Sequence, residues 1–533
     1  MLRKITLLLA LFTLICCPKG RASEHAFALT DKDLYFTGER LHVSVCITDS
    51  LLIPSALSRV AYVEVSDTYH LCLQAMVALV DGRGWADISL PSTLHSGNYL
   101  LSVYTRAMRN GDLTHDSSLF TKVISVVNPS RLFRADDIAV LPADSLATLA
   151  PTTSFEQLEA TPNATVSIPL PEGHPLLRTA SLYPTDVVAP SYEGFSPQLR
   201  QLSTPTSSTR FLPEYEGHIV ISRPSSEASV VEHTRLVMIG KEATLYDGQW
   251  QPDGTWHYYT IGLYGRRPVF LSTVSPEGEE VTMEFVSPYA KLVPQTLPQL
   301  KVCADEAQFR QRAQSALLEQ AVSEWQGQQI GQQDSLNYSS VLLSAKPRYS
   351  YDLDEYTRFS SVREILIEFV RGVKHDKVSG VDQLFVLDSE MHEYSSWSAL
   401  VLLDGMPVFN ISDILNYDAR LLQYVNIYTD RYIFGSQIYG GIISFTSRKG
   451  QLSNFSLRSG MKLAIYNFPQ LCPAFVAPRE AKAGTLYWNP AVGTSDHEII
   501  APETPGHYRL VVQQVDPTGV CHVRCFELVV EAK

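Results

Sequence analysis

The stretch "LTDKDLYFTGERLHVSVCITDS" (residues 29–50) has the pattern of two β-strands joined by a turn. After a polar turn at residues 37–39, its second half alternates apolar and polar residues. Because side chains alternate between the two faces of a β-strand, Leu41, Val43 and Val45 share one face. The pattern therefore predicts strands that bury one face in a hydrophobic core.

More strand candidates follow at short intervals along the chain. They are "VAYVEVSD" (60–67), "LCLQAMVALVDGRGWADISLP" (71–91) and "HSGNYLLSVYTRAMRNGD" (95–112). Asp81-Gly82, inside the second of these, is a turn signal. Short strands with a turn about every ten residues are typical of an antiparallel β-sandwich.

This first segment resembles the MG2 type of macroglobulin domain found in large exported Bacteroidetes proteins. The residues that carry the resemblance are Asp33, Leu34, Tyr35, Gly38, Glu39, Gly97, Tyr99 and Tyr104. The resemblance implies a β-sandwich over residues 24–128, in which these residues have structural roles. An unrelated fibronectin-like or immunoglobulin-like sandwich would have the same architecture and the same lack of catalytic chemistry.

The following segments have different textures. Residues 129–210 are rich in Pro, Ser and Thr, which predicts a second β-domain with long loops, and residues 211–300 predict a third sandwich. Residues 301–345 contain many helix formers, with Phe309, Ala313, Leu317 and Val322 spaced for one buried stripe, so we expect a helical connector.

Strands alternate with helices in residues 346–450. Ser361 is placed to cap a helix with apolar residues at helical spacing, and "NISDILN" (410–416) is a second short capped helix. "DQLFVLD" (382–388), "ALVLLDGMPV" (399–408) and "QIYGGIISFTSRKG" (437–450) are predicted strands. This pattern predicts an α+β module.

The order of motifs in this module resembles the plug domain of TonB-dependent outer-membrane receptors. The matching residues are Asp404, Gly405, Pro407, Gly435, Tyr439, Gly440, Gly441 and Gly450. A receptor barrel needs well over ~200 residues for its strands, whereas residues 451–533 have the pattern of one more macroglobulin-like β-domain. We therefore expect a multidomain, mainly β chain of tandem macroglobulin-like or immunoglobulin-like β-sandwiches, with an inserted α+β plug-like domain that lacks the barrel.

The first 23 residues predict an export signal. Arg3 and Lys4 precede an apolar run, and Ala22-Ser23 are small residues at a possible cleavage site. Two outcomes stay open, which are cleavage near Ser23 and lipid attachment at Cys16 or Cys17. No later apolar run reaches the ~18 residues of a membrane-spanning helix. We expect a chain of the cell envelope, in the periplasm or associated with the outer membrane.

Charge and cysteine content exclude several classes of protein. The chain has 43 basic and 56 acidic residues, a net charge of −13, which argues against general binding of nucleic acid or anionic lipid. After the signal, the cysteines are Cys46, Cys72, Cys303, Cys472, Cys521 and Cys525, too few for a disulfide scaffold of this size. Cys521 and Cys525 are ~13 Å apart along a strand, beyond disulfide reach, so we expect them to be packed or separately paired.

No sequence motif of catalysis is present. The chain lacks a Gly-x-Ser-x-Gly elbow, a His-Glu-x-x-His helix, a phosphate-binding Gly-rich loop and a dinucleotide fingerprint. "YDLDEY" (351–356) could bind Ca²⁺ weakly, but a solvated loop is the favoured interpretation. We expect no catalytic residue, no cofactor and no metal site.

Two functions from different classes remain. The first is an interaction or scaffold protein whose partners are outer-membrane or periplasmic proteins. The alternative is a glycan- or peptide-binding protein, or an uncatalogued hydrolase, that uses the aromatic run Trp256-His257-Tyr258-Tyr259. Strand alternation would bury half of these side chains, which favours core packing over ligand binding.

Overall fold

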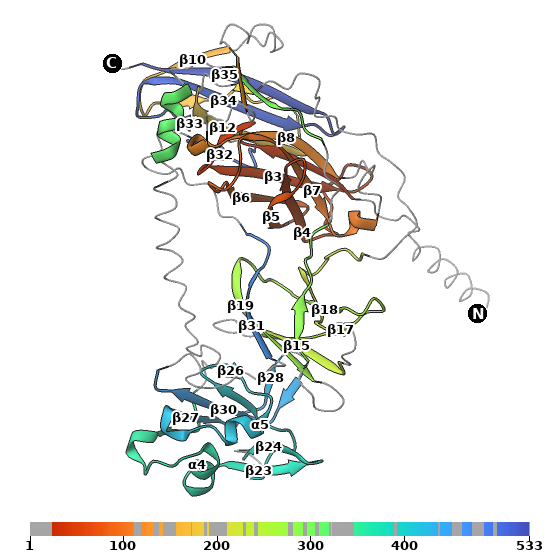
Figure 1. The fold of residues 1–533 in the computed structure, drawn as a ribbon, viewed down its shortest axis with the longest axis vertical. Helices are drawn as coiled ribbons and strands as arrows, with labels where there is room; N and C mark the ends of the chain where they lie inside the picture. Colours follow the sequence, from red (N-terminus) through yellow and green to blue (C-terminus); the bar gives the residue numbers. More distant parts are fainter. Residues whose placement is uncertain are drawn as a thin grey trace, which may run out of the picture. The chain divides into compact units, whose positions relative to one another are not determined.

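The computed structural model divides the chain into two compact units (Figure 1). Unit 1 comprises Met1–His218, Tyr289–Gln329 and Pro469–Lys533, and unit 2 comprises Ile219–Pro288 and Ile330–Phe468. The structure describes residues 24–110, 119–131, 138–141, 156–171, 173–185, 189–190, 211–226, 231–238, 244–274, 281–290, 296–303, 309–318, 321, 346–388, 392–434, 437–449, 461–471, 484–493 and 498–531.

The first sandwich of unit 1 has one sheet of three strands and one of five. The first sheet has the order β1 (His25–Thr30), β3 (Arg40–Thr48), β6 (Arg83–Ser89). The second has the order β2 (Leu34–Phe36), β8 (Phe120–Val127), β7 (Gly97–Thr105), β4 (Val60–Ser66), β5 (Leu71–Ala78). Leu41, Val43 and Val45 on β3 are fully buried, which confirms the predicted core face.

The opposite face of β3 is buried as well. His42, Ser44 and Cys46 are at most 6% exposed, and the Ser44 hydroxyl donates to the carbonyl oxygen of Pro490 at 2.6 Å. A third sheet of unit 1 supplies this cover, because β12 (Leu177–Pro184) packs against β3. The face of β3 that carries His42, Ser44 and Cys46 therefore lies between two sheets rather than in water.

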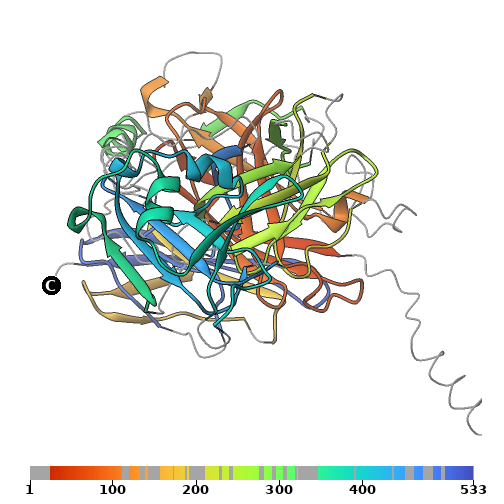
Figure 2. The same cartoon turned by 90° about the horizontal axis from the view of Figure 1, so that it is seen from below.

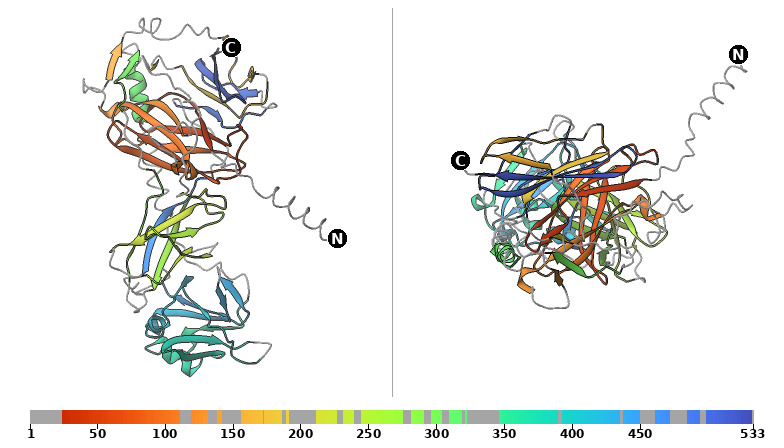
Figure 3. Two further views of the ribbon diagram at one scale, coloured as in Figure 1. Left: turned by 90° about the vertical axis from the view of Figure 1, so that its right-hand side faces the viewer. Right: turned by 90° about the horizontal axis from the view of Figure 1, so that it is seen from above.

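This third sheet joins strands that are far apart in the sequence. Its order is β10 (Glu156–Ala160), β35 (Cys521–Val530), β34 (Gly506–Val515), β12, β32 (Tyr487–Asn489), and β11 (Thr165–Ser167) pairs with β33 (Glu498–Ile500) beside it. The ladder between β12 and β34 runs over eight residue pairs. One sheet is thus shared by the ranges 129–210 and 451–533, which the sequence assigned to separate domains; the boundaries themselves stay a prediction. Figure 3 shows the blue β34 and β35 beside the yellow strands of the earlier range.

The remaining elements of unit 1 are short. They are β9 (Ile138–Leu141), β13 (Ala189–Pro190) and β21 (Leu300–Cys303) in one small sheet, η1 (Ala107–Asn110), η2 (Pro129–Arg131), and a helix over residues 309–318. In this helix Phe309, Ala313 and Ala316 are buried, but Leu317 is 38% exposed. The buried stripe therefore turns toward Ala316 rather than Leu317, and Val322 lies outside the described residues.

Unit 2 contains a sandwich of two four-stranded sheets. One has the order β17 (Gln249–Trp250), β18 (Trp256–Tyr259), β14 (Ile219–Pro224), β20 (Met283–Phe285), and the other has β16 (Thr244–Asp247), β15 (His233–Met238), β19 (Arg266–Val274), β31 (Met461–Asn467). Since β19 and β31 are paired neighbours, the α+β module is inserted between two adjacent strands of one sheet.

The α+β module has a five-stranded sheet with the order β22 (Tyr349–Asp352), β27 (Leu422–Tyr428), β30 (Ile442–Ser447), β25 (Leu400–Leu403), β26 (Met406–Pro407). Its other elements are η4 (Leu353–Glu355), α4 (Val362–Glu368), α5 (Ile411–Leu415), η5 (Ala419–Leu421) and the hairpins β23 (Val373–Val378)–β24 (Val381–Val386) and β28 (Tyr432–Phe434)–β29 (Gln437–Tyr439). Figure 2 shows these elements in green to blue.

Both predicted helix caps of this module are present. Ser361 and Glu364 form a capping box at α4, and the Asn410 side chain accepts from the backbone of Ser412 at α5. The chain is thus a multidomain, mainly β protein built from β-sandwiches, as the sequence predicted. Within the described residues, we find no helix with the length and apolar character needed to cross a membrane.

Candidate functional site

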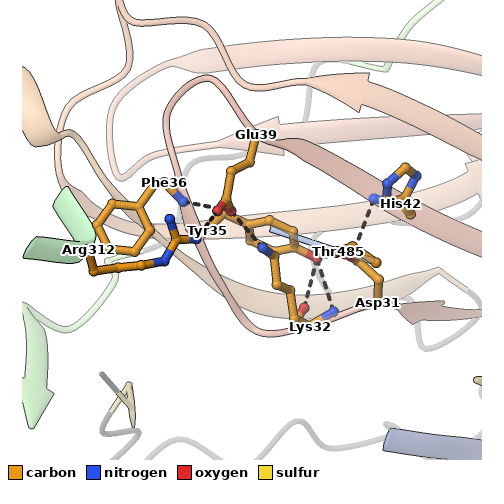
Figure 4. Close-up of polar contacts among 8 residues, drawn as sticks. All are labelled: Asp31, Lys32, Tyr35, Phe36, Glu39, His42, Arg312 and Thr485. Carbon is orange, nitrogen blue, oxygen red and sulfur yellow. Dashed lines mark hydrogen bonds and ion pairs between the residues drawn. The ribbon is translucent and has the colours of Figure 1, made fainter. Parts of the chain in front are cut away.

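The macroglobulin-type motif forms a buried polar network in unit 1 (Figure 4). The Tyr35 hydroxyl donates to Asp31 at 2.7 Å, and Asp31 also accepts from the backbone of His42 at 3.1 Å and from the Thr485 hydroxyl. Burial, followed by the charge of Asp31, raises the pKa of Tyr35 well above its usual value. The network ties the opening turn of the chain to residue 485.

Glu39 is the second centre of this network. Its carboxylate lies 2.7 Å from Lys32 Nζ, accepts from the backbone of Phe36 at 3.0 Å, and pairs with Arg312 of the helix over residues 309–318. Burial acts to raise the pKa of Glu39, but the two cations outweigh it and hold the pKa below its ordinary value. The Arg312 guanidinium also lies 4.7 Å from the centroid of the Phe36 ring. Glu39 therefore fixes the helix to the sandwich.

The other motif residues of the first sandwich have local roles. Leu34 begins β2, and Gly97 begins β7. Asp33 pairs with Lys122 at 2.7 Å. Gly38 has φ +94° and donates to the carbonyl oxygen of Leu90 at 2.7 Å, which a residue with a Cβ would do under strain. The Tyr99 hydroxyl donates to the carbonyl oxygen of His95 at 2.7 Å.

A second buried polar group lies on the outer face of β4 and β7, and we call it the outer layer. Its members are Tyr62, Glu64, Tyr104, Arg106, Arg109, Phe211, Glu214, His218 and Tyr289. Tyr104 stacks on Tyr62 with ring centroids 5.5 Å apart and accepts from the backbone of Ala290 at 2.7 Å. Glu214 accepts from the Tyr62 hydroxyl at 2.8 Å and lies 2.9 Å from His218 Nδ1. This layer could not be recognised in the sequence because its members come from four separated segments.

The outer layer holds segments through which the chain enters and leaves unit 1. Residues 211–218 are the last residues of unit 1 before the chain enters unit 2, and residues 289–290 are the first after the chain returns to unit 1. The third return, at residues 469–470, pairs with β5 through Gln470, whose backbone donates to Met76 at 2.7 Å. The outer layer fixes two of these chain crossings and β5 fixes the third, so all three are held by one sheet of unit 1.

The residues that carry the resemblance to a plug domain include an aspartate turn. Asp404 and Gly405 have φ of +50° and +83°, the left-handed pair of a tight hairpin turn between β25 and β26, and Pro407 ends β26. The Asp404 carboxylate accepts from both the backbone and the hydroxyl of Ser447. The turn therefore joins β25 to the end of β30, so two separated parts of the motif meet in space.

The glycines of the motif lie where chain segments approach closely. A Cβ on Gly440 would lie 1.9 Å from Ser395 Oγ, and one on Gly441, which has φ +135°, would lie 2.7 Å from the Tyr428 carbonyl oxygen. Tyr439 pairs with Tyr432 across the β28–β29 hairpin. Gly435 and Gly450 lie outside the described residues.

The β28–β29 hairpin exposes apolar side chains on one face, which we call the isoleucine face. Ile433 and Ile438 are direct cross-strand partners and are 70% and 48% exposed. Tyr432 and Tyr439 point to the other face and pack against the module's core. Arg431 continues the isoleucine face and lies 4.7 Å from the Trp397 ring centroid. This is exposed apolar surface with a cationic edge.

Within the described residues of the module, His375, Asp382 and Ser412 form a polar cluster. His375 Nε2 lies 2.7 Å from Asp382, and the Ser412 hydroxyl donates to the same carboxylate at 2.6 Å. In a nucleophilic triad the serine hydroxyl forms a hydrogen bond with the histidine ring, whereas here the serine and the histidine both bind the aspartate. This cluster ties β24 to α5.

The acidic run at residues 351–356 is used in local pairing. Asp352 caps η4, and Asp354 pairs with both Arg358 and Arg448. Within the described part of the chain, no group of three His, Cys, Asp or Glu residues could hold a metal ion.

The aromatic run of the alternative function is half buried. Trp256 is 7% exposed and Tyr258 is fully buried, with its hydroxyl 3.0 Å from Ser222 and 2.7 Å from Thr234. Trp250, which the sequence did not single out, is 59% exposed and pairs with Trp256.

Four cysteines are free thiols, namely Cys46, Cys72, Cys521 and Cys525. Burial raises the pKa of both Cys521 and Cys525. The Cys303 side chain and Cys472 lie outside the part of the chain that the structure describes.

No family model matches the chain, and no curated protein matches it. Among solved structures, trypsin-activated alpha-2-macroglobulin from Escherichia coli is 10% identical, with 96% of this chain and 42% of that chain covered and a TM-score of 0.24. Salmonella alpha-2-macroglobulin reacted with methylamine is also 10% identical, with 96% and 40% covered and a TM-score of 0.24. The CARDB domain of a Pyrococcus furiosus protein is 13% identical, with 20% and 94% covered and a TM-score of 0.15.

The chain spans less than half the length of these macroglobulins. At such TM-scores the neighbours carry no argument about function, and the fold class follows from the sheets described above.

Proposed function

We propose that the chain is a non-enzymatic, exported interaction or scaffold protein of the bacterial cell envelope. In this proposal it acts at the outer membrane with transport or surface proteins, and its α+β module is a TonB-receptor plug-like domain without the barrel, in a chain of the Bacteroidetes type. The sandwiches support and present this module.

The isoleucine face is the observation that carries the proposal. Two directly paired isoleucines are 70% and 48% exposed, although the opposite face of the same hairpin packs into the core. Exposed apolar surface with a polar rim is typical of protein-binding sites. The hairpin also offers strand edges, which are common sites for pairing with a partner strand.

The absence of catalysis is part of the proposal. The His375, Asp382 and Ser412 side chains bind one another in a structural tie. Glu39 is paired with two cations. Neither arrangement leaves a nucleophile beside a base.

Crosslinking tests the proposal. A photo-crosslinking residue at Ile433, introduced into the exported chain in a Gram-negative host, is expected to capture intact outer-membrane proteins. The double variant Ile433→Asp with Ile438→Asp should lose most of this co-purification. Ile500→Asp is the matched control, because Ile500 is 71% exposed on β33 of unit 1. Recovery of the chain alone after crosslinking, or equal capture by all variants, would contradict the proposal.

The alternative function, binding of a glycan or peptide, has less support. Because Trp256 and Tyr258 belong to the sandwich core, a Trp256→Ala variant would lose stability whether or not a ligand binds. The exposed Trp250 is the proper test position. Loss of glycan-array binding in Trp250→Ala, with unchanged melting temperature, would favour this alternative over a scaffold role.

A further inference from the structure

Arg106 is a buried cation at the end of β7. Its side chain is 2% exposed, and the Nε and Nη1 atoms have no hydrogen-bond partner within the described part of the chain. A buried charge without a partner is costly, and proteins normally pair such groups or bind a counter-charge. The position therefore calls for a group that accepts hydrogen bonds.

A second cation lies beside it. Arg106 and Arg109 both lie against the ring of Phe211, with their Cζ atoms 5.6 and 4.2 Å from its centroid. Phe211 is held by Asn110, whose side chain donates to its carbonyl oxygen and accepts from its N–H, each at 2.7 Å. Burial lowers the pKa of Arg109 and Arg106 acts in the same direction, whereas Tyr104 and Glu214 act to raise it. The two guanidinium groups thus share one enclosed aromatic wall.

The carboxylates of the outer layer, Glu64 and Glu214, act electrostatically on Arg109 and also have hydrogen-bond partners of their own. Glu214 accepts from Tyr62 and lies against His218. Glu64 lies opposite Ser102 on β7, four residues from Arg106, and accepts from Gln74 at 3.0 Å. Glu64 Oε2 and the Nε and Nη1 atoms of Arg106 all lack a hydrogen-bond partner in the described part of the chain, so these atoms do not pair with one another.

We propose that Arg106 and Arg109 form a binding site for a small oxyanion of the phosphate or carboxylate class, enclosed by residues 211–218. Guanidinium N–H groups form strong, charge-assisted hydrogen bonds to such oxyanions. The Phe211 ring excludes water on one side and keeps the two cations close. The site is separate from the isoleucine face, so it does not depend on the proposed partner.

Thermal denaturation of the full exported chain tests the site. In chloride buffer at constant ionic strength, inorganic phosphate is expected to raise the melting temperature saturably, by about 2–4 °C. The Arg106→Met variant keeps the apolar stem without the charge, so it should lose this rise. In chloride alone it should melt at or above the wild-type temperature, because the buried charge is gone.

Controls separate the site from general salt effects. Arg40→Met removes an exposed cation that pairs with Asp87, and it should keep the phosphate-dependent rise. Arg106→Lys keeps the charge but not the planar donors, and it should show a smaller rise. Sulfate and acetate arms distinguish a phosphate-type ligand from a carboxylate. An equal rise in wild type and Arg106→Met, or no rise and no phosphate retained after gel filtration, would overturn the proposal in favour of a guanidinium hydrated by water alone.

Discussion

Asp404 holds Ser447 by two hydrogen bonds, because the backbone N–H and the hydroxyl of Ser447 each donate to the Asp404 carboxylate at 2.6 Å. Asp404 is 6% exposed and opens the turn after β25, while Ser447 is the last residue of β30. The two hydrogen bonds tie the Asp404-Gly405 turn to the end of β30.

Loss of this link should destabilise the module. Asp404→Ala leaves a buried N–H and a hydroxyl of Ser447 without acceptors, so we expect the free energy of unfolding to fall by about 2–3 kcal/mol. Asp404→Asn keeps one acceptor and tolerates the left-handed backbone, so its free energy of unfolding should fall by about half as much. Urea denaturation measures both, with exposed Asp430→Ala as the control. Equal stability of all three variants would refute the role of Asp404.

Gly440 should not tolerate any side chain. A Cβ at this position would lie 1.9 Å from Ser395 Oγ and 2.5 Å from the Trp397 carbonyl oxygen, and the backbone atom cannot rotate away. We expect Gly440→Ala to lower the free energy of unfolding by about 3 kcal/mol. Gly97→Ala, where the nearest atom is 4.0 Å away, should change it by less than about 1 kcal/mol.

Glu39 should make stability depend on acid pH. Its pKa in the folded state is held below the ordinary value of 4.5, so its contribution is fully present above that pH and is lost as pH falls through the folded pKa. At pH 7, Glu39→Gln leaves Lys32 and Arg312 without a counter-charge and should cost about 3 kcal/mol. The difference from wild type should shrink on acidification, and a gap that stays constant from pH 7 to pH 3 would contradict the assignment.

Glu64 should behave in the opposite way. Burial raises its pKa, so the folded state favours the protonated carboxyl, and stability is lost as pH rises through the folded pKa. Its Oε2 atom has no hydrogen-bond partner within the described residues, whereas Oε1 accepts from Gln74. Glu64→Gln keeps the Oε1 acceptor and removes the charge. It should therefore raise the free energy of unfolding by about 1 kcal/mol at pH 7 and have little effect near pH 4. A destabilising effect at pH 7 would show that Glu64 is paired.

Local features of the fold could be predicted from the sequence. The alternation in residues 40–48, the Asp404-Gly405 turn and the caps at Ser361 and Asn410 were all recognisable, because each depends on a few neighbouring residues. Such patterns report the conformation of a segment and its buried face.

Long-range pairing could not be predicted in the same way. The pairing of β12 with β34 joins residues that are more than three hundred positions apart, and alternation does not say which strand is the neighbour. The outer layer and the contact of Arg312 with Glu39 were missed for the same reason, since Glu, Arg and Tyr on separate segments give no pattern until the chain brings them together. The buried stripe of the helix was predicted only in part, because Ala316 rather than Leu317 faces the core.

The insertion of the α+β module into the unit 2 sandwich has a consequence for biosynthesis. The edge of β19 that pairs with β31 must wait for a strand that begins only at Met461. At about 5–20 residues per second, roughly ten to forty seconds of translation separate the two strands. An unpaired edge of this kind attracts other strands and promotes aggregation. Holdase binding to nascent chains that end before residue 461 should therefore be strong and should fall once β31 has emerged.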